Sequence, residues 1–530
     1  MHDIAIIGGG HNGLVAAGLL ARANLSVCVV ERRDLLGGAS VTEELWPGFR
    51  SSRAAYVAGL LRPSVIRELE LERFGLSLIA RRPSSFTPLP DGRALILSPE
   101  PGVSADSIAA FSQRDARRFG DYEALLEVCA SLVEPLLDVP PPDPGQLRAG
   151  DAGPLWRVAR RLLPERRRFA EAMGVFLAPA ADTLRRFFES EPLLSTLATD
   201  AIIGAWTSPG TPGSGYVLLH HVMGETHGER GVWAYVRGGM GGLAEALAAS
   251  ARAAGAEIRT AAPVSEVMVR DGKARGLCLE NGEEIEARFV LSGIDPHHTF
   301  CELVPDGALP EDFLSDVRAI DYRSPVAKIN LALDRLPRFR ASASDGPLPE
   351  HAATIHLGAT DLAGLERSFD AARAGVLPER PMIEMTLPSS VDDSLAPCGR
   401  HVASLFVQHV PSDRKSWTGD LREGLAKRVF SLIDEAAPGF SDSILHHEVL
   451  APPDVERIFG LRGGNIFQGA MSLDRLLYAR PVAGYSRYRT PIDGLYLCGA
   501  AAHPGGGVMG ACGRNAAAVV LRDVRRASRG

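Results

Sequence analysis

Three glycines near the start of the chain have the spacing of a phosphate-binding turn. They are Gly8, Gly10 and Gly13, which form G-x-G-x-x-G directly after an apolar run. Such glycines allow a tight turn and a close approach of the backbone to a pyrophosphate. The helix that follows offers its N–H groups and the positive end of its dipole to the phosphates. Glu31 comes about 20 residues later, where a carboxylate suits the two hydroxyls of an adenosine ribose, so these residues predict dinucleotide binding.

The elements that must position this turn follow in the required order. Ile4–Ile7 is apolar throughout and is typical of a buried parallel strand. Leu14–Arg22 is predicted as a helix, and Val27–Val30 as a second strand that ends at Glu31. Strand, glycines, helix, strand and carboxylate in this order are a stronger signal than the glycines alone. The sequence therefore predicts an α/β fold with a Rossmann-like domain at the start of the chain.

A second glycine-rich unit lies near the other end of the chain, in "RTPIDGLYLCGAAAHPGGGVMGACGRNAA". Leu495–Cys498 is predicted as a buried strand, Gly499 as its turn, and Gly505–Gly507 as a loop that enters a helix through Gly510–Val520. Such a unit can aim backbone N–H groups at another part of an elongated cofactor. A nicotinamide dehydrogenase has no need of a second cofactor unit here, so the two units together favour a flavin, FAD.

Several blocks of the sequence resemble one known family. Glu31, Arg33 and the pair Gly37-Gly38 are similar to the pattern of a flavoprotein superfamily that includes amine oxidases and phytoene desaturases. The blocks "GHNGLVAA", "ERRDLLGGASVTEELWPGFRSSRAAYV", "GGNIFQGAMSLDRLLYARP" and "LYLCGAAAHPGGGVMGACGRNAA" resemble the pyridine nucleotide-disulphide oxidoreductase domain-containing protein 2 family, a branch of the phytoene desaturase-like flavoproteins. The resemblance implies FAD as the cofactor and an FAD-binding domain of the glutathione reductase/amine oxidase type.

The resemblance also implies contacts with FAD at particular positions. In that superfamily the second glycine pair lies against the phosphate and ribose region, and Val264 matches the position beside the adenine, although a plain core valine is the alternative. The C-terminal unit meets the ribityl chain and the isoalloxazine. Ala39 stands where many relatives have Arg, which weakens an amine-oxidase interpretation. Ala500 stands where relatives often have an Asp that binds the ribityl hydroxyls, so this contact is not carried over. The cofactor-binding residues expected are Gly8, Gly10, Gly13, Glu31, Arg33, Gly37, Gly38, Val264, Gly499, Gly506, Gly507 and Val508.

The length of 530 residues predicts more than one domain. The interior of the chain is helical in pattern at first and then mixes strands with helices, which predicts a discontinuous α+β substrate domain with a strand floor and a helical cap. A pocket is expected where the two domains meet. The predicted bounds are 1–84, 235–296 and 459–530 for the FAD-binding domain and 85–234 and 297–458 for the substrate domain. The strands expected in the last segment are Ala327–Leu333, Ile383–Leu387 and Ala403–His409.

Catalysis by a flavin needs placement, electrostatics and exclusion of water more than a dedicated set of side chains. His503 is the best single catalytic candidate, because H-P-G-G-G places it just before the helix expected at the flavin ring. It could act as an acid or base or orient the isoalloxazine, and a turn histidine bonded to the backbone is the alternative. No Ser/His/Asp arrangement, paired carboxylates or metal-ligand spacing emerges, so no metal site is expected.

The composition indicates which kinds of partner and which cellular compartment to expect. A net charge of -7 argues against nucleic acid as a partner. The seven cysteines contain no C-x-x-C pair, so a disulfide framework or thiol–disulfide site is not expected, and a reducing, cytoplasmic location fits. No room precedes the first strand for a signal peptide, and no apolar run of about 18 residues predicts a membrane span. A homo-oligomer stays open as an alternative to a monomer.

One basic segment suggests peripheral contact with a membrane. Arg157–Arg168 contains six arginines beside apolar residues such as Trp156. A basic amphipathic helix can lie on an anionic membrane surface, and the solvated face of a cap helix is the alternative. Any such contact is expected to be weak and sensitive to salt.

These patterns together predict an FAD-dependent oxidoreductase. The expected reaction is dehydrogenation, or desaturation, of a small apolar organic substrate, with electrons passed to oxygen, a quinone or another carrier. One alternative is a redox-neutral flavin-dependent isomerase or a saturase. Another is an FAD-bearing scaffold that binds a partner protein.

Overall fold

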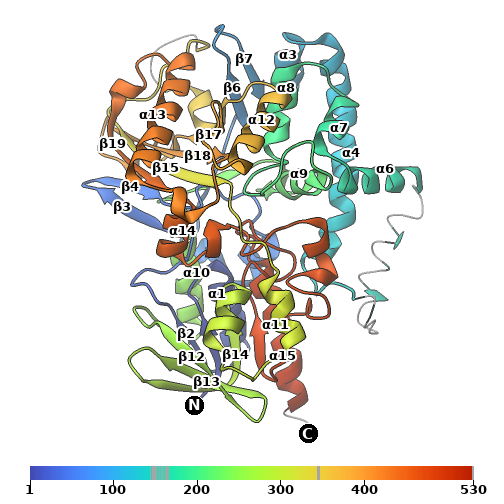
Figure 1. Cartoon of the computed structure of the whole chain (residues 1–530), viewed down its shortest axis with the longest axis vertical. Coiled ribbons are helices and arrows are strands. Elements are labelled where there is room, and N and C mark those ends of the chain that lie inside the picture. The colour runs from blue at the N-terminus through green and yellow to red at the C-terminus, as the bar shows by residue number, and fades with distance from the viewer. Residues whose placement is uncertain are drawn as a thin grey trace.

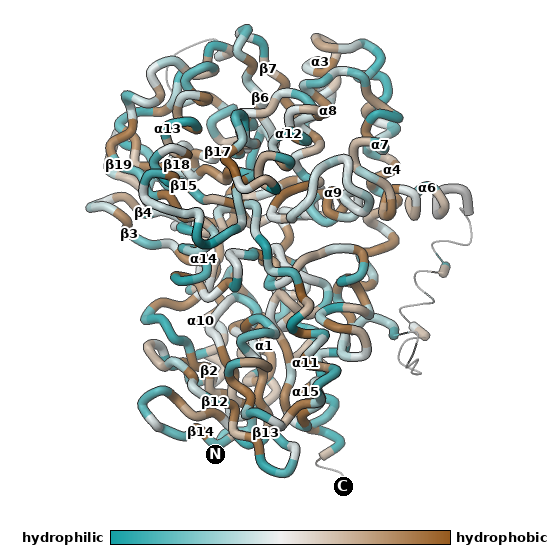
Figure 2. Tube along the Cα trace, in the orientation of Figure 1, coloured by the Kyte–Doolittle hydropathy of each residue, from teal (hydrophilic) through white to brown (hydrophobic). Residues whose placement is uncertain are grey.

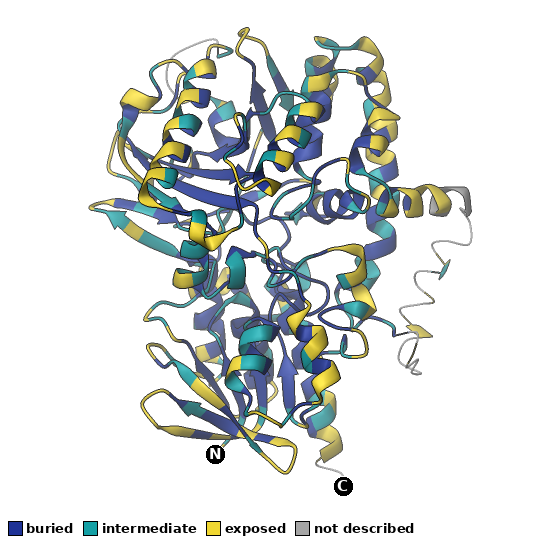
Figure 3. Cartoon of the chain, viewed as in Figure 1, coloured by how far each residue is buried: buried dark blue, intermediate teal, exposed yellow. Residues whose placement is uncertain are grey.

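Two seven-stranded sheets organise the chain, one above the other in Figure 1. The structure is a computed structural model and describes residues 1–143, 145, 152–153, 156, 159–160, 166–342 and 347–527. We call the sheet nearer the two termini the lower sheet and the other the upper sheet. Most strands of both sheets are buried, and the exposed residues lie on the outward faces of the helices and on the hairpin at the lower edge (Figure 3).

The lower sheet joins strands from the beginning, middle and end of the sequence. Its parallel part has the order β11-β2-β1-β14-β20, and a hairpin of β12 and β13 continues antiparallel from β14. β2, β20 and the inner ends of β1 and β14 are apolar and buried, as strands covered by helices require, whereas β11 at the edge is partly exposed (Figure 2). Their bounds are β1 (His2–Ile7), β2 (Val27–Val30), β11 (Glu257–Arg259), β12 (Val264–Arg270), β13 (Lys273–Leu279), β14 (Glu284–Ser292) and β20 (Leu495–Leu497).

Three helices pack beside one another at the lower sheet, with α1 contacting both of the others. They are α1 (His11–Arg22), α10 (Met240–Ala253) and α15 (Ala511–Ala527). The strands and helices predicted around the two glycine-rich units are therefore confirmed, with ends that differ by a few residues. The turn and helix over residues 298–318, including α11 (Glu311–Arg318), also pack into the lower core through Phe300 and Phe313, although they follow the predicted boundary at 297.

The upper sheet has the order β19-β15-β18-β17-β16-β6-β7. The pair β16–β6 is parallel and the other neighbours are antiparallel. One face is apolar and packs against α13 (Gly419–Ala436), as alternate residues of the strands require. The bounds are β6 (Ser85–Pro88), β7 (Ala94–Leu97), β15 (Val326–Leu333), β16 (Thr354–Gly358), β17 (Met382–Thr386), β18 (His401–Gln408) and β19 (Ile444–Leu450).

Helices cover the other side of the upper sheet and form the expected cap. Their core joins residues of α4, α8 and β18, so cap and sheet share one apolar cluster. The segment 85–234, which we predicted as helical, begins with the strands β6 and β7 of the upper sheet and then becomes helical. The cap helices are α3 (Val103–Ala109), α4 (Gln113–Leu137), α6 (Arg166–Leu177), α7 (Ala180–Arg185), α8 (Glu191–Thr199), α9 (Ser214–Val222) and α12 (Leu362–Arg373).

Shorter elements connect the two sheets. They are the hairpin β3 (Thr42–Trp46) and β4 (Phe49–Ser52), the pair β5 (Leu78–Ala80) and β10 (Ala234–Val236), the pair β8 (Glu225–Thr226) and β9 (Glu229–Arg230), and helices α2 (Pro63–Glu68) and α14 (Pro452–Phe459). In the described ranges, none of the helices is both long and apolar enough to cross a membrane. Much of the basic segment Arg157–Arg168 lies outside the described residues, so its predicted membrane contact stays a prediction.

Candidate active site

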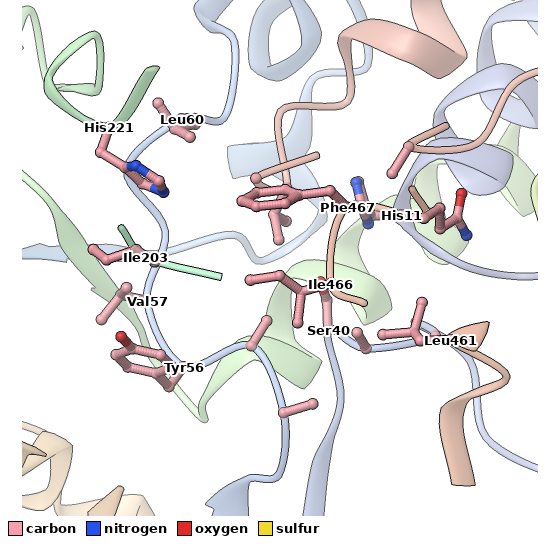
Figure 4. A pocket seen from close by; sticks show the side chains of 18 of the residues that line it. His11, Ser40, Tyr56, Val57, Leu60, Ile203, His221, Leu461, Ile466 and Phe467 are labelled. Carbon is pink, nitrogen blue, oxygen red and sulfur yellow. The ribbon is translucent and has the colours of Figure 1, made fainter. Parts of the chain in front are cut away.

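A cavity of about 1110 Å³ runs between the two sheets. Its lower end is lined by the turn after β1 and the start of β12, and its upper end by strands of the upper sheet. Figure 4 shows its middle, where Val57 and Leu60 lie near His221, with Ile466 and Phe467 farther along the wall. A site for one small molecule usually occupies about 300–1000 Å³, so this cavity has room for an elongated ligand that reaches both sheets.

The glycine turn after β1 forms the lower wall of the cavity. A Cβ atom at Gly13 would lie 2.2 Å from the carbonyl oxygen of Gly8, so α1 can approach the turn only because that position has no side chain. Gly8 has a φ of +93°, which favours glycine. A Cβ at Gly10, in contrast, would meet no atom within 4 Å and would enter the cavity. The turn therefore leaves open the space that a pyrophosphate needs.

Glu31 lies at the end of β2, beside the glycine turn. Its Oε2 accepts a hydrogen bond from the Gly9 N–H at 2.8 Å, and its Oε1 accepts one from the Arg33 N–H at 3.0 Å. The side chain is mostly buried and lines the cavity. Two backbone donors thus hold the carboxylate at the cavity wall, where its remaining lone pairs can accept hydrogen bonds from a ribose.

Glu31→Ala is expected to weaken FAD binding by about 10- to 150-fold. The basis is the loss of a hydrogen bond to a charged group, which is worth about 1.5–3 kcal/mol. Titration of the apoprotein with FAD, followed by flavin fluorescence, measures the effect. Glu31→Gln keeps the size and one acceptor oxygen and should fall between the two proteins; equal affinity in all three would contradict the predicted ribose contact.

Arg33 and the second glycine pair continue the same wall. The Gly37 N–H donates to the Gly9 carbonyl at 2.8 Å, and this bond brings the second pair against the first turn. Arg33 Nη2 donates to Glu43 at 3.0 Å, whereas its buried Nη1 has no partner among the described residues. Gly38 and Val264 also line the cavity. An unpaired guanidinium nitrogen beside a glycine cradle fits an anionic, phosphate-bearing ligand.

The C-terminal unit reaches the same cavity from the other side. Gly507 and Val508 line the cavity, and Ala500 does so as well. Gly499 and Gly506 are not lining residues, because they lie behind this wall: an added Cβ would be 2.5 Å from the Gly293 carbonyl and 2.6 Å from the Phe467 ring, respectively. The structure thus brings most of the predicted cofactor residues to one cavity, while their individual contacts with FAD stay predictions.

His503 is buried and its ring points away from the cavity wall. Its Nε2 lies 2.8 Å from the carbonyl oxygen of Leu136 at the end of α4, and the residue is not among those that line the cavity. Burial lowers the pKa of His503 to about 4, so the ring is neutral at neutral pH. The structure gives the predicted acid–base role no geometric support, and this role stays a prediction.

Arg480 is a structural residue of the site that we did not predict from the sequence. It is 2% exposed, and its guanidinium donates to the carbonyl oxygens of Phe467 at 2.7 Å, of Ala470 at 2.9 Å and of Ala500 at 2.9 Å. Phe467 and Ala500 both line the cavity. Arg480 therefore fixes two cavity-lining loops to each other.

A row of side chains crosses the upper sheet on the face that lines the cavity. Lys328 on β15 pairs with Phe406 on β18, Phe406 pairs with Glu384 on β17, and Glu384 pairs with His356 on β16. Directly paired residues point to the same face of a sheet, and all four line the cavity. We did not predict this row from the sequence. The pattern that could have indicated it is a single ionisable residue between apolar neighbours in each of three strands.

The charged members of this row are buried. Lys328 and Glu384 are 3% and 4% exposed. The Tyr56 hydroxyl donates to Glu384 Oε2 at 2.7 Å, and Lys328 Nζ lies 3.7 Å from the centroid of the Tyr56 ring. Burial lowers the pKa of Lys328, lowers that of His356 to about 3, and raises that of Glu384. Burial thus favours the neutral form of each of these groups.

Asp200 faces the same part of the cavity from the cap. Burial raises its pKa to about 7, and the nearby Glu384 adds to this shift. A carboxyl group whose pKa is higher in the folded chain than in the unfolded chain stabilises the fold at low pH. That contribution is lost as the pH rises from the unfolded pKa, near 4, through the folded value near 7.

Asp200→Asn is therefore expected to flatten the pH dependence of stability between about pH 4 and about pH 7. Each unit of pKa shift corresponds to about 1.4 kcal/mol, so the variant should gain stability relative to the parent as the pH rises. Thermal midpoints of the two FAD-loaded proteins across this range measure the difference. Parallel pH profiles would show that Asp200 does not titrate with a raised pKa.

The chain is similar over its whole length to known flavoproteins. A family model described as flavin containing amine oxidoreductase matches residues 13–521. The pyridine nucleotide-disulfide oxidoreductase domain-containing protein 2 of Rattus norvegicus is 47% identical over 548 residues, which cover 99% of this chain and 94% of that protein. Hydroxyneurosporene desaturase of Cereibacter sphaeroides is 28% identical, with 99% of each chain covered.

A solved structure shows the same fold. Cyclohexylamine oxidase from Brevibacterium oxydans superimposes with a TM-score of 0.59 and 15% identity, and 99% of each chain is covered. At this identity the likeness is one of architecture. Together with the family match, it confirms the predicted fold class, an α/β fold of the amine oxidase type.

Proposed function

Because the chain belongs to the flavin containing amine oxidoreductase family, it is an FAD-dependent oxidoreductase, and we propose that it dehydrogenates a small organic molecule whose reacting part is apolar. The observation that carries the proposal is one continuous cavity, which joins the glycine turns of the lower sheet to a space walled by apolar side chains. Those side chains include Leu60, Leu197, Ile203, Phe406, Ile466 and Phe467.

The residues of the lower sheet fit FAD. The open space over Gly10 suits the pyrophosphate, Glu31 suits the ribose, and the free Nη1 of Arg33 suits the anionic middle of the cofactor. The turn at Gly507 and Val508 would then meet the isoalloxazine. When bound, FAD supplies the acceptor for the hydrogen removed from the substrate.

The chain's own part in the reaction is to orient the substrate and exclude water. The apolar walls and the cap helices α4 and α8 cover the middle of the cavity. His220 Nε2 lies 3.0 Å from the Gly506 carbonyl and stabilises the turn at the reactive end. Burial lowers the pKa of His220 to about 3 and that of His221 to about 4, so neither brings a positive charge to this wall at neutral pH.

Anaerobic reduction of the bound flavin tests the proposal. The holoenzyme is mixed without oxygen with a panel of small apolar and amphipathic molecules, and the flavin absorbance is followed; re-oxidation by oxygen or by a quinone then identifies the electron acceptor. Bleaching with a dehydrogenated product is the expected result. Product without bleaching would favour a redox-neutral isomerase, and an intact, FAD-loaded protein that converts nothing would favour a scaffold.

A further inference from the structure

The upper end of the cavity is polar, although the rest of its walls are largely apolar. We call the set Tyr56, Arg81, Lys328, His356 and Glu384 the polar end; all five line the cavity. They come from two connecting segments and three strands of the upper sheet, so the fold brings them together from distant parts of the sequence. A dry site for a wholly apolar molecule has no use for so many buried ionisable groups, since each costs free energy to bury.

The polar end has more hydrogen-bond donors than acceptors. Lys328 Nζ and Arg81 Nε are buried atoms with no hydrogen-bond partner among the described residues, and His356 Nδ1 has none either. The acceptor Glu384 is already engaged on Oε2 by the Tyr56 hydroxyl at 2.7 Å. Buried polar atoms are normally satisfied, so these nitrogens point to acceptors that a ligand brings.

Arg81 gives the strongest indication of the ligand's charge. It is 4% exposed and makes no ion pair with any described residue. Its Nη1 donates to the hydroxyl of Thr354, and its guanidinium carbon lies 5.6 Å from the centroid of the Tyr235 ring. Neither partner carries a negative charge. A buried guanidinium of this kind is matched best by an anion held through paired hydrogen bonds.

The charge count favours a single negative charge on the ligand. If Lys328 and Glu384 are both ionised they cancel each other, and if both are neutral they add nothing. In either state Arg81 leaves one positive charge on the five residues of the polar end, and Asp200, which faces the same part of the cavity, is only partly ionised at neutral pH because burial raises its pKa to about 7. A carboxylate supplies one negative charge and two acceptor oxygens, whereas an ammonium group would face Arg81 with a like charge.

The polar end lies close enough to the turn at Gly507 for one small molecule to reach from one to the other. Leu60 packs at Gly507, where an added Cβ would be 2.5 Å from Leu60 Cδ1, and Tyr56 is only four residues earlier in the chain. An extended chain covers at most about 3.6 Å per residue, so the Cα atoms of Tyr56 and Leu60 are no more than about 14 Å apart. Figure 4 shows Tyr56, Val57 and Leu60 along this wall.

We propose that the polar end is the anchor for a carboxylate of the substrate, and that the substrate is an amphipathic molecule with an apolar body and one carboxylate. Arg81 and Lys328 hold the carboxylate, and the apolar walls direct the body towards the turn at Gly507. The proposal rests on the proposed function, which supplies the reaction at the other end of the cavity.

Binding of a matched ligand series to the FAD-loaded protein tests the proposal without requiring turnover. Octanoate, octanamide and octylamine have bodies of equal length, and their affinities can be measured from the perturbation of the flavin spectrum and by calorimetry. Octanoate is expected to bind about tenfold or more tightly than the other two, since hydrogen bonds to charged groups are the strong ones. Lys328→Met and Arg81→Met should each remove this preference, with octanamide binding little changed.

Lys427→Met is the matched control, because Lys427 is exposed on α13 and is not among the residues that line the cavity. It should keep the preference for octanoate. If Arg81→Met fails to retain FAD, the Lys328→Met result decides. Equal binding of octanoate and octanamide, or tighter binding of octylamine, would overturn the carboxylate anchor. Flavin bleaching by a substrate without a carboxylate would still support the proposed function. Absence of bound FAD in the parent protein would instead overturn the function itself.

Discussion

Gly10→Val is expected to fold like the parent protein and to purify without FAD. Gly10 has a φ of -71°, which any residue can adopt, and its missing Cβ would meet no protein atom within 4 Å. The added side chain would instead occupy the space beside the backbone where the pyrophosphate must approach. Overpacking costs about 1–3 kcal/mol, and a lost charge-assisted hydrogen bond about 1.5–3 kcal/mol, so FAD affinity should fall by about 100-fold or more.

The measurement is the flavin-to-protein ratio after purification, followed by FAD titration and by circular dichroism of the apoprotein. Gly424→Val is the matched control, because Gly424 also has open space around its missing Cβ but lies on the exposed face of α13. It should retain FAD in full. A yellow Gly10→Val protein with parental affinity would show that the cofactor does not cross this turn.

Arg480→Met is expected to destabilise the protein by about 3–5 kcal/mol, because several buried carbonyl groups lose their donor at once. The carbonyls of Phe467, Ala470 and Ala500 all accept from this one guanidinium. Methionine fills a similar volume but donates nothing. Arg480→Lys should recover only part of the loss, since an ammonium group lacks the planar fork of donors.

Denaturant and thermal unfolding of the FAD-loaded proteins measure this effect. Arg373→Met, at an exposed position of α12, serves as the control and should change stability by about 0.5 kcal/mol or less. A small effect at Arg480 equal to that at Arg373 would mean that the two loops hold their positions without this contact.

The cofactor half of the site could be predicted from the sequence because its determinants are local. Gly8, Gly10, Gly13 and Glu31 lie within a single strand–turn–helix–strand unit, so their spacing alone fixes their relative positions. The C-terminal unit is equally compact. Each of the two glycine-rich units also needs particular residue types. At Gly13, for example, only a residue without a side chain allows the close approach of α1.

The substrate half could not be predicted, because its residues meet only through tertiary structure. Lys328, His356 and Glu384 become neighbours through strand pairing, and the register that aligns them is absent from any local motif. His503 illustrates the same limit, because its Nε2 pairs with the carbonyl of Leu136 on α4, a residue far away in the sequence. Arg480 likewise depends on carbonyl groups from separate loops.

The pairing of β1, β14 and β20 in one sheet has a consequence for the order of events during synthesis. A ribosome makes β1 before its partner β14, and β20 later still. The edge of β1 that faces β14 therefore stays uncovered until β14 has been made, and such edges favour aggregation. We expect the nascent protein to depend on chaperones, and FAD to be captured only after the C-terminal unit has left the ribosome.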